Sequence, residues 1–76
     1  MKKTVEMPNG RKMTIEKGLT IDGKQREIRK FFNKEGKLHR KMGAAVIVFQ
    51  DGKLIEEKFY NNGKLRGARG IQQMIR

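Results

Sequence analysis

Clusters of lysine and arginine are the residues of this chain whose type and spacing point to a chemistry. Lysine and arginine number 19 against 8 aspartates and glutamates, which gives a formal net charge of +11 at pH 7 over 76 residues. The excess of positive charge peaks in two stretches, residues 37–41 and 64–69. Cationic side chains grouped in this way attract polyanions and bind phosphates by releasing counterions. Phosphate binding is therefore the chemistry that these residues favour.

The candidate binding residues are the cations of these two stretches together with three that precede the first stretch. They are Arg26, Arg29, Lys30, Lys37, Arg40, Lys41, Lys64, Arg66 and Arg69. Reading a base sequence would also need side chains at base edges or stacking aromatics. Phe31 and Tyr60 are the aromatics interleaved with the cations, but their place in expected strands favours a core role. We therefore expect contacts mainly to the phosphate backbone, with little sequence preference.

The sequence patterns of common catalytic and metal sites are missing. The chain has no cysteine, and its single histidine, His39, cannot form a multi-histidine metal site. Glu56 and Glu57 are adjacent in an expected strand, so their side chains point to opposite faces and cannot act together on one substrate. Neither a dinucleotide-binding glycine pattern nor a P-loop occurs. We expect a protein that is not an enzyme and that uses no cofactor and no metal.

Turn signals divide the chain into segments that suit β-strands. Glycine followed by a basic residue occurs at positions 10, 23, 36, 52 and 63, and four of these glycines directly follow asparagine or aspartate. Asn-Gly and Asp-Gly pairs adopt positive φ at low cost, as tight hairpin turns require. The spacing leaves room for one strand and one connection in each interval. The sequence predicts a mostly β fold, an antiparallel meander of hairpins.

Apolar patterns place the core and the ends of the predicted sheet. Residues 44–49 are apolar on both alternating faces, which predicts a central strand covered on both sides. Ile71, Met74 and Ile75 recur at helical spacing and predict a short C-terminal helix that caps the sheet. At this length we expect a single domain. Its parts would be an N-terminal hairpin over 1–21, two hairpin repeats over 22–67 and a C-terminal cap over 68–76.

Residues 22–38 and 51–65 align as an internal repeat. Both contain Asp-Gly-Lys, a glutamate four positions after the glycine, an aromatic pair followed by asparagine, and a final Gly-Lys-Leu. Residues 52–67 resemble the variant MORN repeat of bacterial and phage proteins. Residues 36–40, Gly-Lys-Leu-His-Arg, resemble a related bacteriophage repeat, which has proline where this chain has Ala44. The resemblance covers about residues 22–67 and implies a repetitive antiparallel sheet, a non-catalytic interaction role and a phage origin.

Stacked repeats would place equivalent turns on the same side of the sheet, so the two basic clusters would form one positive ridge. We therefore expect a basic binding module for a polyanionic partner, foremost nucleic acid or a nucleoprotein complex. The alternative is a phage-encoded inhibitor that docks on an acidic surface of a host enzyme, because a cationic surface complements both targets.

Other features of the sequence indicate the cellular location and the assembly state of the protein. The longest apolar run, residues 44–49, is too short to span a bilayer, and we expect no membrane insertion. The absence of cysteine, and of an apolar run after the basic start, indicates the cytoplasm, or the host cytoplasm for a phage protein. The outer strands of a short sheet need cover, so pairing of two copies through the sheet edges stays open.

Overall fold

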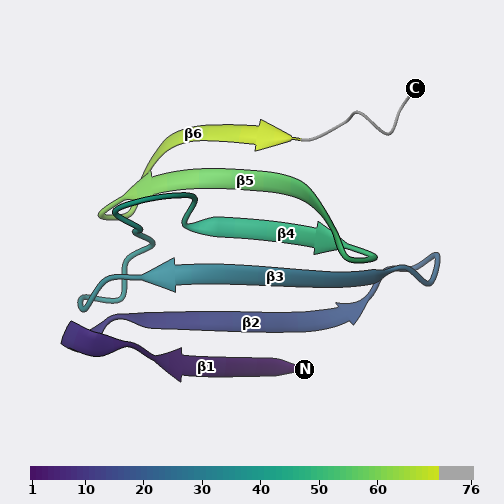
Figure 1. The fold of residues 1–76 in the computed structure, drawn as a ribbon, viewed down its shortest axis with the longest axis horizontal. Helices are drawn as coiled ribbons and strands as arrows, with labels where there is room; N and C mark the ends of the chain where they lie inside the picture. Colours follow the sequence, from purple (N-terminus) through teal and green to yellow (C-terminus); the bar gives the residue numbers. More distant parts are fainter. Residues whose placement is uncertain (71–76) are drawn as a thin grey trace.

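Six antiparallel strands form one sheet in the computed structural model of this chain, which describes residues 1–70 (Figure 1). The strands are β1 (Lys2–Glu6), β2 (Lys12–Leu19), β3 (Gln25–Phe32), β4 (Val46–Gln50), β5 (Lys53–Asn61) and β6 (Lys64–Gly70). A 3-10 turn, η1 (Pro8–Gly10), connects β1 to β2. Every strand pairs with its neighbours in sequence, in the order β1-β2-β3-β4-β5-β6. The prediction of a mostly β antiparallel meander is confirmed.

The tight turns use the residues that the sequence analysis singled out. Asp51 and Gly52, which connect β4 to β5, have φ of 51° and 80°. Asn62 and Gly63, which connect β5 to β6, have φ of 51° and 87°. Two successive residues with positive φ give a two-residue hairpin the twist of its flanking strands. Local turn chemistry therefore determines where these two hairpins reverse.

The core is small and lies at the start of the central strand. Among residues 1–70, the buried ones are Ala44, Ala45, Val46 and Val48, each exposed by 8% or less. The strand β4 is central, because β3 and β5 pair with its two sides. The prediction that both of its faces are covered is wrong, since Ile47 and Phe49 on the alternate face are only half-buried. The described residues form a single layer, and a single layer leaves one side of its central strand partly open to solvent.

The end of the described chain differs from the predicted C-terminal cap. Residues 68–70, which were assigned to that cap, instead form the last part of β6, paired with β5. The predicted helix over 71–76 lies outside the described residues. Among residues 1–70, no helix is long and apolar enough to cross a membrane.

Candidate functional site

The meander brings every second connection to the same end of the sheet. The connections β1–β2, β3–β4 and β5–β6 lie at one end, on the left in Figure 1, and the connections β2–β3 and β4–β5 lie at the other. We call the first the three-loop end and define it as residues 7–12, 33–41 and 61–66. We call the second the two-turn end and define it as residues 19–24 and 51–53.

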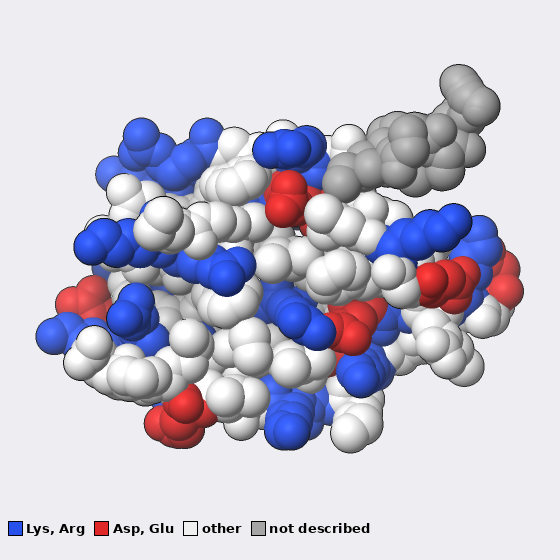
Figure 2. Space-filling model, in the orientation of Figure 1, with Lys and Arg blue, Asp and Glu red and all other residues white. Residues whose placement is uncertain are grey.

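Charge is distributed very unevenly between these two ends. The three-loop end carries eight lysines and arginines and one carboxylate, Glu35. The two-turn end carries two lysines and two aspartates, so its charges cancel. In Figure 2, blue side chains gather along the left-hand end of the molecule, whereas blue and red are mixed at the right-hand end. The three-loop end is therefore the main source of positive potential among the described residues.

The cations of the three-loop end are not neutralised within the sheet. The ion pairs among residues 1–70 join Lys2 to Glu16, Lys17 and Arg29 to Glu27, Lys58 to Glu56 and Arg69 to Glu57. None of these pairs includes a cation of the three-loop end. The cations of that end consequently have no carboxylate partner among residues 1–70.

Two asparagines tie the second and third loops together. The Oδ1 atom of Asn33 accepts hydrogen bonds from the backbone amides of Glu35 and Lys37, at 2.9 and 3.0 Å. The Nδ2 atom of Asn33 donates to Oδ1 of Asn62 at 3.1 Å. The backbone amide of Asn62 in turn donates to Nδ1 of His39 at 3.0 Å. The loops thus form one hydrogen-bonded unit that exists before any partner binds.

Backbone contacts reinforce this unit and include the first loop. The amide of Gly63 donates to the carbonyl of Leu38 at 2.8 Å. Gly10 in η1 lies so close to Lys34 that a Cβ atom on the glycine would stand 3.2 Å from the lysine Cβ. That separation is tight for two side-chain carbons, so glycine allows η1 to lie directly against the β3–β4 loop.

Arg40 anchors the β3–β4 loop to the sheet. Its guanidinium carbon lies 4.0 Å from the centroid of the Phe31 ring, in a cation–π contact. Its NH1 group donates to the carbonyl of Ala44 at 3.3 Å. Arg40 is half-buried, whereas the next residue, Lys41, is exposed. The arginine therefore has a structural role, and the ring of Phe31 is engaged by Arg40 as well as by the sheet.

The nine candidate cations fall into two groups. Five lie at the three-loop end: Lys37, Arg40, Lys41, Lys64 and Arg66. Four lie elsewhere in the sheet: Arg26, Arg29, Lys30 and Arg69. The basic turns over residues 33–41 and 61–66 therefore lie at the same end of the sheet, and four of the nine candidate residues lie outside them.

The four outlying cations have partners or positions of their own. Arg26 begins β3 near the two-turn end and donates to Oε1 of Gln50 at 2.8 Å. Arg29 pairs with Glu27 and lies over the Phe49 ring at 5.4 Å. The Nε atom of Arg69 is 3.7 Å from Oε1 of Glu57. Lys30 lies within β3, paired in register with Val46. These side chains belong to the sheet surface rather than to the three-loop end.

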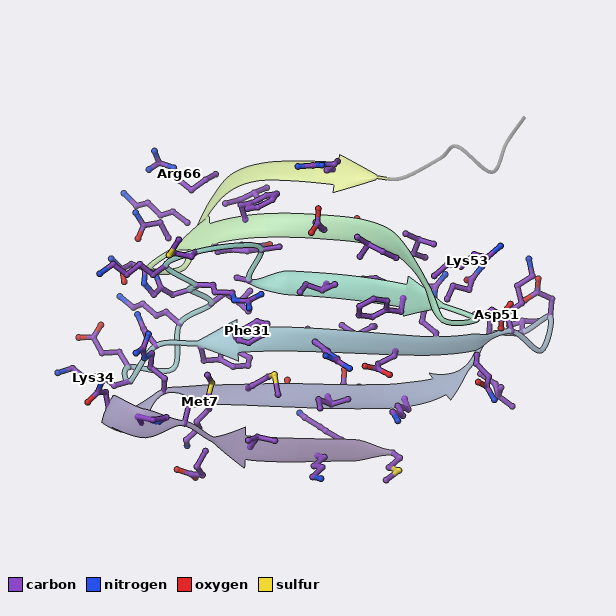
Figure 3. The ribbon with its side chains drawn as sticks, viewed as in Figure 1. Met7, Phe31, Lys34, Asp51, Lys53 and Arg66 are labelled. Carbon is purple, nitrogen blue, oxygen red and sulfur yellow. The ribbon has the colours of Figure 1, made fainter. Side chains whose placement is uncertain are left out.

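Three further cations at the three-loop end were not among the candidates: Arg11, Lys12 and Lys34. Figure 3 shows Lys34 and Arg66 at the same end of the ribbon, with Asp51 and Lys53 at the other. The parity of the meander could have identified these cations, because the first, third and fifth connections of a meander must lie together. The charge maxima along the sequence alone did not.

A hollow of about 460 Å³ opens among the three loops. Its lining includes Arg11 from the first loop, Asn33, Lys34, His39 and Lys41 from the second, and Asn62 from the third. Glu35 is the carboxylate at its rim. The volume falls within the roughly 300–1,000 Å³ that is common for small-molecule sites. The hollow is therefore the most defined concave feature of the basic end.

Comparisons with known proteins found no match: no protein-family model, no curated protein and no solved structure is similar to this chain.

Proposed function

We propose that this chain is a non-catalytic nucleic-acid-binding module that holds a phosphate backbone against its three-loop end. The observation that carries the proposal is the segregation of charge. Eight cations that form no ion pair among residues 1–70 lie at one end of the sheet with one carboxylate, and the charges at the other end cancel. A charge-dense ridge of this kind attracts a polyanion over a long range and releases its counterions on contact.

The dimensions of the ridge support the same function. Strands in a sheet lie about 4.8 Å apart, so the first and third loops are separated by about 19 Å across four strand spacings. One strand of B-DNA carries a phosphate about every 3.4 Å of helix axis, so the ridge matches about five phosphates. Engagement of about five B-DNA phosphates makes log K fall with log salt concentration at a slope near −4.5.

The prefolded loops favour affinity without sequence preference. The hydrogen bonds among Asn33, Asn62 and His39 order the loop backbones in the free protein, so less entropy is lost on binding. The aromatics near the ridge, Phe31 and Tyr60, are half-buried in the sheet. Lysine and arginine contacts to phosphates position a nucleic acid but do not distinguish its bases.

The experiment is a salt titration of oligonucleotide binding by fluorescence anisotropy, with two matched double variants. Lys41→Gln with Arg66→Gln removes two exposed charges from the three-loop end. Lys24→Gln with Lys53→Gln removes two from the two-turn end. We expect the first variant to reduce the magnitude of the salt slope by about 2 and the second to leave it nearly unchanged. Equal effects of the two variants, or no binding at low salt, would contradict the proposal.

An acidic surface of a host protein is the alternative partner, since it would fit the same ridge. Affinity capture from lysate with and without nuclease separates the two. Nucleic acid recovered in a salt-sensitive manner supports the proposal, whereas one stoichiometric protein retained after nuclease treatment at high salt replaces it. The proposal also includes action in the cytoplasm, or in the host cytoplasm if the repeat resemblance reflects a phage origin. The absence of cysteine supports that location.

A further inference from the structure

The hollow at the three-loop end is lined by hydrogen-bonding side chains as well as by charged ones. Three of its side-chain acceptor atoms are already used by bonds within the protein. Oδ1 of Asn33 takes two backbone amides, Oδ1 of Asn62 takes Nδ2 of Asn33, and Nδ1 of His39 takes the amide of Asn62. These three acceptors hold the loops together, and Glu35 and Asn9 are the lining residues whose side-chain oxygens take part in no hydrogen bond or ion pair among residues 1–70.

The lining also offers a ligand a set of donors. The two amides bonded to Oδ1 of Asn33 fix the orientation of that side chain, and Asn33 in turn fixes the orientation of Asn62, whose Nδ2 remains free to donate. A neutral imidazole that accepts at Nδ1 carries its proton on Nε2, so His39 offers an N–H. Lys34 and Lys41 add two ammonium groups, and Arg11 adds a guanidinium group. Donors that line one hollow together with three cations suit an oxyanion.

From this arrangement we propose that the hollow is a seat for a single phosphate group. Its oxygens would bind Lys34 and Lys41, the guanidinium of Arg11, and the N–H groups of His39 and Asn62. The inference rests on the proposed function, because it specifies how one phosphate of a bound nucleic acid is held. That phosphate is either an internal phosphodiester or a terminal monoester, and both share this chemistry.

A substitution of Glu35 tests the phosphate seat by an expected gain in binding rather than a loss. Glu35 lines the same hollow, so its negative charge opposes an anion there, while its part in the loop network is played by its backbone amide. Replacing Glu35 by Gln should strengthen phosphate binding by about two- to fivefold, the effect of one removed charge at short range in water. Glu6→Gln is the matched control, because Glu6 ends β1 beside the same end of the sheet but does not line the hollow.

The measurement is a titration of the labelled protein with inorganic phosphate, followed by ¹H–¹⁵N correlation spectra at constant ionic strength in chloride. We expect the largest shifts at the Asn62 side-chain amide and the His39 imidazole, and tighter binding for Glu35→Gln than for Glu6→Gln. Shifts spread evenly over all surface lysines, or equal effects of the two variants, would overturn the seat. His39→Asn keeps an acceptor for the Asn62 amide but removes the imidazole N–H, and should weaken binding.

Two arms with oligonucleotides separate the sources of the phosphate. If the seat takes a terminal monoester, only a 5′-phosphorylated oligonucleotide moves the His39 and Asn62 resonances. If it takes an internal phosphodiester, the 5′-hydroxyl oligonucleotide moves them equally. Salt-dependent oligonucleotide binding that leaves these resonances unmoved refutes the seat and preserves the proposed function. Phosphate-induced shifts of the His39 and Asn62 resonances without oligonucleotide binding support the seat and refute the proposed function.

Discussion

Arg40 and Lys41 are neighbours in sequence and have different environments in the structure. The guanidinium of Arg40 lies over Phe31 and donates to Ala44, whereas Lys41 is exposed and lines the hollow. Two cations that look equivalent in the sequence are therefore expected to differ in function. One holds the loop, and the other faces the partner.

Serine substitutions at these two positions should separate stability from binding. Arg40→Ser should lower the free energy of unfolding by about 1–2 kcal/mol, because the cation–π contact and a hydrogen bond are lost together. Lys41→Ser should leave the free energy of unfolding within about 0.5 kcal/mol and weaken nucleic-acid binding. Urea unfolding and anisotropy measure the two quantities. Equal losses of stability in both variants would show that Arg40 is not an anchor.

The fold changes the ionisation of Asp22. The hydroxyl of Thr20 donates to its carboxylate and lowers the pKa of Asp22 below its ordinary value. A group whose pKa is lowered by folding stabilises the folded state at pH values above its unfolded pKa. That contribution is lost as the pH falls through the folded value.

Removing the Thr20 hydroxyl should reverse this shift. Thr20→Val should raise the pKa of Asp22 toward its ordinary value, because the largest cause of the lowering is gone. Thr20→Ser keeps the hydroxyl and should keep the lowered pKa. Carboxyl ¹³C shifts followed by NMR between about pH 2 and 6 cover the range in which aspartate titrates. An unchanged pKa in Thr20→Val would assign the shift to the nearby cations instead.

At the scale of elements, the hairpin β5–β6 shows how turn chemistry determines the position of the basic residues. Asn62 and Gly63 reverse the chain within two residues, and Lys64 begins β6 immediately afterwards. The register shifts between Phe59 and Tyr60, where β6 has one residue more than β5. This irregularity lies beside Arg66, on the strand that carries the third loop's cations.

Alanine substitutions at two glycines of this hairpin should have different effects on the free energy of unfolding. Gly63→Ala should cost about 1–2 kcal/mol, because φ of 87° is unfavourable for a residue with a Cβ atom. Crowding adds little, since that Cβ would lie 3.5 Å from the Lys37 side chain. Gly67→Ala has open space and no positive φ, so it should be neutral or stabilising by up to about 1 kcal/mol. Thermal unfolding compares them, and a loss at Gly67 would contradict the strand assignment.

At the scale of the whole molecule, the sheet concentrates like charges at one end and has little core to compensate. The buried residues are four small side chains within positions 44–48. Eight cations with one carboxylate at the three-loop end repel one another in the free protein. The same distribution that suits a polyanion therefore opposes folding in its absence.

Salt should consequently stabilise the free protein. Raising the ionic strength from about 0.01 to 0.15 M shortens the screening length from about 30 to 8 Å. We expect Tm to rise by several degrees, since about 1 kcal/mol corresponds to about 4–8 °C in a domain of this size. Lys34→Gln combined with Lys41→Gln should show a smaller rise in the same thermal scan. A Tm that falls with sodium chloride in both proteins would show that repulsion is not significant.

Local signals in the sequence determined much of the fold. Asp51-Gly52 and Asn62-Gly63 marked turns, and residues 44–49 marked the central strand, because φ preferences and strand alternation act over a few residues. The prediction that both faces of that strand are covered was wrong, because the sequence of one strand does not show whether a second layer packs against it. The role of Arg40 was also missed, because it depends on Phe31, nine positions earlier, and on a contact across a loop.

The amino-acid sequence alone determined the strands, the turn types and the total charge of this protein. Only the tertiary structure decided which charges act together. Strand pairing joins residues far apart in the chain, so it places Arg11, Lys34 and Lys41 around one hollow and leaves Arg26, Arg29 and Arg69 on the sheet. The hydrogen bonds of Asn33 and Asn62 then use three acceptors of that hollow, and such long-range pairing has no signature in local sequence.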